Sequence, residues 1–150
     1  MIQVLQASHN GELYKRHVRS VDDIADVIRE RNLATLTNRS GIDFWFTPSI
    51  HRAHLFVNRN ATEIFLATTR FTAANVPLLR GIVVLAAHDV AGEPADLDDA
   101  RIDTLAETIG SLSWREDLVL SRRIATDQRR RLRASRTTTR TEAADLSWMT

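Results

Sequence analysis

Cysteine is absent from this chain of 150 residues, and lysine occurs only once, at Lys15. Without cysteine there is no disulfide framework, no thiolate nucleophile and no thiolate metal site. The longest apolar run, residues 82–87, has the length of a strand and falls far short of the roughly 18 residues of a membrane-spanning helix. The first residues lack the basic and apolar regions of a secretory signal. These absences predict a cytoplasmic protein with no membrane partner.

Motifs for catalysis and cofactor binding are also missing. The five glycines form no phosphate-binding loop, no nucleophile elbow precedes a helix, and the acidic residues lack the spacing of a calcium loop. We therefore predict no catalytic residue, no cofactor and no resident metal. Enzymatic activity is the less favoured reading.

The histidines offer one alternative to that reading. His51 and His54 lie three residues apart, and the pair His88-Asp89 follows an apolar run. Together they could supply the ligands of a metal-dependent hydrolase, in which the metal lowers the pKa of a bound water. These pairs are short and common, so we favour surface or structural histidines and keep the hydrolase as a second alternative.

The remaining pattern is that of one α+β domain over residues 1–112. Alternating residues on both sides of Asn10-Gly11 predict a β-hairpin, and the β-branched run 82–85 predicts a central strand. Ser20 begins a helix that should end near Asn32, and Gly110 should stop another. We expect a mixed or antiparallel sheet with two or three helices, built from strands 2–8, 12–18, 33–38, 42–47 and 82–85 and helices 20–32 and 98–109.

Residues 53–69 fit two structures. Strands over 53–57 and 62–68 would form a pair around Asn58-Arg59-Asn60. Alternatively, Asn60 and Glu63 would cap a short helix over 61–69. The strand pair is the interpretation we favour, and the helix stays open.

Charge is distributed unevenly along the chain. Residues 1–114 carry 11 basic and 14 acidic side chains, whereas residues 115–140 carry nine arginines against three acids. A GC-rich genome, as in actinobacteria and their phages, accounts for the preference for arginine over lysine but not for its position. The basic segment predicts an anionic partner, or neutralisation by the acidic body.

A helix over residues 113–134 would separate these arginines from apolar residues. Ser113 and Glu116 form a capping box, and residues 135–150 read as a flexible tail that ends in a hydrophobic cluster. At 100° per residue, Arg131 points toward the apolar arc, and the other arginines form a stripe on the opposite side. The stripe holds Arg115, Arg122, Arg123, Arg129, Arg130, Arg133 and Arg136. The apolar residues of the helix and tail are Trp114, Leu118, Leu120, Ile124, Leu132, Leu146, Trp148 and Met149.

This helix supports two hypotheses of different class. In the first, a non-enzymatic accessory protein contacts nucleic acid backbone, or an acidic protein, through the arginine stripe. In the second, the apolar residues dock a protein partner or a second copy, as in a structural component of a phage or mobile element. Burial of the apolar arc on the chain's own domain would favour the first hypothesis. A contact between that arc and another chain would favour the second.

Overall fold

The computed structural model describes residues 1–49 and 54–147, with side chains described as far as residue 134. Its strands are β1 (Ile2–Ala7), β2 (Leu13–Val18), β3 (Ala34–Thr37), β4 (Asp43–Phe46), β5 (Val83–His88) and β6 (Pro94–Ala95). Its helices are α1 (Val21–Ile28), α2 (Arg59–Ala67), α3 (Asp99–Glu107) and α4 (Trp114–Ser147). The predicted α+β class is confirmed.

The strands form one antiparallel sheet in the order β2-β1-β5-β4-β3, and β6 pairs with β5 outside this path. The β-branched run lies in the centre, as predicted. Leu85 of β5 lies between Leu5 of β1 and Phe44 of β4, and all three side chains are buried on one face. Its neighbour Val84 is buried on the other face, because successive side chains of a strand point to opposite sides.

The turn between β1 and β2 has the predicted position. Ile2 pairs with Val18 and Ala7 with Leu13, so the hairpin closes over residues 8–12. Gly11 there has a φ of 87°, a conformation that glycine adopts without steric cost. The hairpin was therefore predictable from its turn residues alone.

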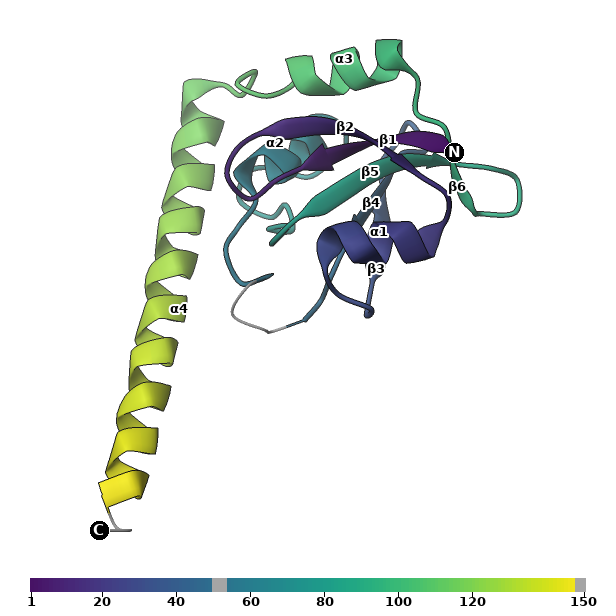
Figure 1. Ribbon diagram of the computed structural model, residues 1–150. Coiled ribbons are helices and arrows are strands. Elements are labelled where there is room, and N and C mark those ends of the chain that lie inside the picture. Colours follow the sequence, from purple (N-terminus) through teal and green to yellow (C-terminus); the bar gives the residue numbers. More distant parts are fainter. Residues whose placement is uncertain (50–53, 148–150) are drawn as a thin grey trace.

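Helices cover both faces of the sheet (Figure 1). On one face, Ile24 and Ile28 of α1 pack with Val84. The other face carries the larger core, to which α2, α3 and α4 all contribute buried side chains. Helix α4 stands beside this body and projects beyond it (Figure 1).

Helix α2 occupies the region for which we favoured strands, and that expectation is wrong. The buried residues Ala61 to Leu66 are consecutive, so the body covers every side of the helix, including the polar residues Thr62 and Glu63. Its cap is Asn58, whose side chain accepts a hydrogen bond from Ala61 N, and not Asn60. Of the strand expected over 53–57, the described residues retain only a bridge between Val57 and Arg80.

Two helix ends differ from expectation. Helix α1 stops at Arg29, which adopts the left-handed conformation at φ 67°, and does not reach Asn32. Helix α4 continues through residues 135–147, which the sequence led us to assign to a flexible tail. That stretch is rich in threonine, which disfavours a helix mildly, but it lacks glycine and proline, which disfavour a helix most.

Candidate functional site

The apolar arc of α4 only partly docks on the body. Leu120 and Ile124 are buried in the larger core. In contrast, Trp114, Leu118 and Leu132 are 72%, 41% and 49% exposed. The exposed residues lie roughly 100° around the helix from the buried pair, at 100° per residue. The body therefore covers only Leu120 and Ile124 of these five residues, and the assignment of the other three to a protein interface stays a prediction.

Polar contacts with α2 hold the first turns of α4. Arg59 donates from Nη2 to Asp117 at 2.5 Å and from Nη1 to the Ser121 hydroxyl at 2.9 Å. Its Nε atom lies 3.3 Å from the buried carboxylate of Glu63, which shares its helix. An acid of α4 is thus paired with an arginine of the body.

A second pair of this kind lies two to three turns further along α4. The two terminal nitrogens of Arg80 donate hydrogen bonds to Asp127, from Nη1 to Oδ2 at 2.5 Å and from Nη2 to Oδ1 at 2.6 Å. Nη1 also donates to the Leu55 carbonyl. The side chains of Arg80 and Asp127 are 21% and 18% exposed. The hydrogen bonds from Arg80 hold the pKa of Asp127 below its ordinary value, against the opposing effect of burial. Arg131 lies 4.0 Å from the same carboxylate.

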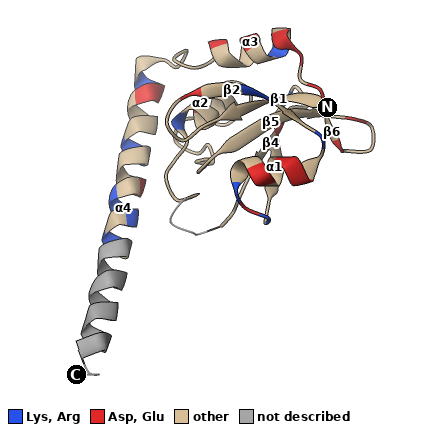
Figure 2. Cartoon of the chain, in the orientation of Figure 1, with Lys and Arg blue, Asp and Glu red and all other residues tan. Residues whose placement is uncertain are grey.

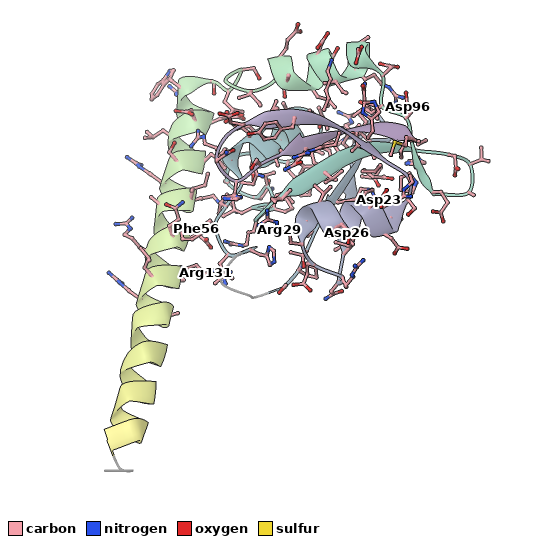
Figure 3. All side chains as sticks on the ribbon, viewed as in Figure 1. Asp23, Asp26, Arg29, Phe56, Asp96 and Arg131 are labelled. Carbon is pink, nitrogen blue, oxygen red and sulfur yellow. The ribbon has the colours of Figure 1, made fainter. Side chains whose placement is uncertain are left out.

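Arg123 does not belong to a free stripe. Its Nη1 donates to the carbonyl oxygens of Ala73 and Val76, at 2.8 and 2.9 Å, and the side chain is partly buried. The sequence pattern placed Arg123 in the stripe and could not show that two carbonyl groups of the body bind it. Arg131 points toward the body, as its position on the helix predicted (Figure 3).

Five arginines of the predicted stripe are exposed on α4, and we call them the outer arginines. No hydrogen bond or ion pair between the described residues joins Arg115, Arg122 or Arg130 to a carboxylate. Among the described residues, Arg129 bonds only to the Ala125 carbonyl of its own helix. Basic residues, coloured blue in Figure 2, recur along α4 between Arg115 and Arg133. The outer arginines are Arg115, Arg122, Arg129, Arg130 and Arg133.

Several predicted site residues lie outside the part of the chain whose side chains the structure describes. The side chains of Arg136 and Leu146 lie beyond the described part, as do Trp148 and Met149. His51 is also outside the described residues. Their assignments remain predictions.

The described residues of the metal-site hypothesis lie in separate contacts. His54 lies 3.7 Å from Glu30, while His88 Nδ1 lies 3.1 Å from the buried Asp43. Asp89 instead accepts from the backbone N–H groups of its own turn. Within the described residues, no group of three or more metal-binding side chains comes together. The partner of His88 is therefore Asp43, across the β4–β5 pair, and not its neighbour in sequence.

Arg59 and Arg80 are the residues that sequence analysis missed. Each pairs with an acid of α4 that is 58 or 47 residues away in the chain. Neither arginine lies in a motif, so only the fold could identify them.

No helix in the described part of the chain is long and apolar enough to cross a membrane. Comparison with models of known protein families, with curated proteins and with solved structures finds no match for this chain.

Proposed function

We propose that this chain binds the phosphate backbone of nucleic acid through the outer arginines of α4. The observation that carries the proposal is how α4 uses its own acids. Of the three acids of α4 whose side chains the structure describes, two, Asp117 and Asp127, are paired with Arg59 and Arg80 of the body. The body thus engages these two acids, and four of the outer arginines, Arg115, Arg122, Arg129 and Arg130, form no ion pair with the described residues.

The spacing of the outer arginines suits a partner that carries closely and evenly spaced negative charges along its length. Arg115, Arg122 and Arg129 recur every seven residues, or about 10.5 Å along the helix at a rise of 1.5 Å per residue. Duplex DNA carries one charge per about 1.7 Å of axis, so a phosphate lies near each arginine in any register. An acidic protein would need carboxylates at matching positions. Nucleic acid is therefore the better partner, with little preference for sequence.

Salt dependence of binding tests the proposal. Five phosphate contacts predict a log–log slope of binding constant against salt of about −4 to −5. We would measure fluorescence anisotropy of two unrelated duplexes and one RNA between 50 and 300 mM salt. Similar affinities for the two duplexes, with this slope, are expected. Absence of binding at 50 mM salt, or binding that salt does not weaken, would overturn the proposal.

A second candidate function rests on the exposed apolar residues of α4. Trp114, Leu118 and Leu132 are exposed beside the outer arginines, and such residues are suited to contact with a second copy of the chain. Light scattering of the native chain, over a hundredfold range of concentration, tests this. A dimer that Leu118→Ala dissociates would favour it, and a monomer throughout would rule it out.

A further inference from the structure

Helix α4 and the segment 78–80 of the body line an open groove with a volume of about 500 Å³. Leu78 contributes its only wholly apolar side chain. The polar and charged lining consists of Arg80, Arg122, Arg123, Thr126, Asp127 and Arg130. Three of these arginines come from the helix and one from the body, so the groove exists only when α4 is docked.

Two of the lining arginines are fixed in place. Arg80 is paired with Asp127, which cancels one positive charge. Arg123 donates to the carbonyl groups of Ala73 and Val76, which orient its guanidinium without neutralising it. One fixed, uncompensated positive charge therefore belongs to the wall of the groove.

The other two arginines are available for a ligand. Arg122 and Arg130 lie eight residues apart, about 12 Å along the helix, with Thr126 midway. Neither arginine, nor the Thr126 hydroxyl, makes a side-chain hydrogen bond to the part of the chain that the structure describes. Two guanidinium forks that flank a hydroxyl donor match the acceptor oxygens of a phosphoryl group.

We propose that this groove binds one phosphodiester group of the nucleic acid, with Arg122 and Arg130 as its ligands and the Thr126 hydroxyl as a neutral donor. Arg123 adds fixed charge, and Arg80 keeps Asp127 neutralised so that its carboxylate does not repel the phosphate. The groove is open and far larger than a phosphate ion, which suits a phosphate that continues into a chain on both sides. This inference rests on the proposed function and adds that the outer arginines are not equivalent.

Two double variants of equal charge test it. Arg122→Gln with Arg130→Gln removes the groove ligands, and Arg115→Gln with Arg129→Gln removes two outer arginines beyond the groove. Each pair should make the salt slope less negative by about two, because each arginine contributes nearly one unit. At 100 mM salt, the affinity for a 20-nucleotide strand or duplex should fall in both double variants. The fall should be at least tenfold larger for the variant that lacks Arg122 and Arg130 than for the variant that lacks Arg115 and Arg129.

Thr126→Val gives an independent measurement, because it removes one hydroxyl on an exposed surface without changing charge or shape. It should weaken binding several-fold and leave the salt slope unchanged. Circular dichroism and urea unfolding of each variant check that α4 remains helical and docked. Equal losses for the two pairs, together with a silent Thr126→Val, would overturn the groove assignment and leave the proposed function intact. Failure of the native chain to bind any nucleic acid would instead overturn the proposed function.

Discussion

Asn58 connects three segments of the chain through one side chain. It is 1% exposed, and its Nδ2 donates to the carbonyl oxygens of Ala7 and Gly81, each at 2.8 Å. Its Oδ1 accepts from Ala61 N at 3.1 Å, which caps α2. The same residue therefore begins α2 and fixes the ends of β1 and of the segment that leads to β5.

Asn58→Asp should lower the free energy of unfolding by about 2–4 kcal/mol, a typical cost of burying a charge that is only partly satisfied by donors. A carboxylate keeps the cap but places negative oxygen against the two carbonyl groups that Nδ2 now binds. Asn60→Asp is the matched control, because Asn60 makes only an exposed hydrogen bond to Gly11. Urea unfolding at pH 7 measures both. Equal losses would contradict the role given to Asn58.

The choice between Asn58 and Asn60 shows a limit of sequence reasoning at this scale. Both residues satisfy the local rule for a helix cap, and both lie just before the same buried stretch. Only the carbonyl groups of Ala7 and Gly81, distant in sequence, distinguish them.

At the scale of elements, α4 is attached to the body by a small apolar contact and several polar ones. Leu120 and Ile124 enter the core, while Arg59, Arg80 and Arg123 supply the polar contacts. Ion pairs of this kind stabilise the docked helix only while the acid is deprotonated. The docking of α4 should therefore depend on pH.

Asp127→Asn should lower the free energy of unfolding by about 2 kcal/mol at pH 7, between the values typical of exposed and buried pairs. Because Arg80 lowers the pKa of Asp127 in the folded state, the pair stabilises the fold above the ordinary carboxyl pKa of about 3.9. This stabilisation is lost as the pH falls below the ordinary value and through the lowered pKa, so the difference between native and variant chains should shrink as the solution is acidified.

Urea unfolding at pH 7, 4 and 2 measures the effect. Glu116→Gln makes the same change of charge on the same helix, at a residue with no ion pair among the described side chains, and should have little effect. A constant difference between native and Asp127→Asn chains at all three pH values would refute the assignment.

On the scale of the whole molecule, charge is segregated although the formal net charge is only +1. The acids of α1 lie on the body and the outer arginines on α4, as Figure 2 shows. Binding to a polyanion depends on this local density and much less on net charge. Position should therefore matter more than the number of charges.

Heparin chromatography separates the two effects. Arg115→Gln, Arg122→Gln and Arg129→Gln together should lower the salt needed for elution substantially. The control replaces Arg19, Arg31 and Arg101, which lie in exposed ion pairs of the body, and loses the same formal charge. It should elute close to the native chain. Similar elution of both triple variants would show that net charge alone governs binding.

Elements with local signals could be predicted from the amino-acid sequence. The Asn10-Gly11 turn predicted the hairpin, the β-branched run predicted the central strand, and Ser113 predicted the start of α4, since Glu116 N lies 3.3 Å from its hydroxyl. It also predicted the arginine stripe, because a period of seven residues returns to one side of a helix. These features depend on neighbours within a few residues.

Three features could be known only from the tertiary structure. These are the helical conformation of α2, the side of α4 that docks on the body, and which arginines of α4 the body binds. Helix α2 is short and is buried on every side, including its polar residues Thr62 and Glu63, and a segment of this length and composition fits a strand as well as a helix. Arg123 looks like its neighbours in sequence, yet the carbonyl groups of Ala73 and Val76 bind it, while Arg122 beside it remains available. Such differences depend on partners about 50 residues away, and no local pattern encodes which segments the fold will bring together.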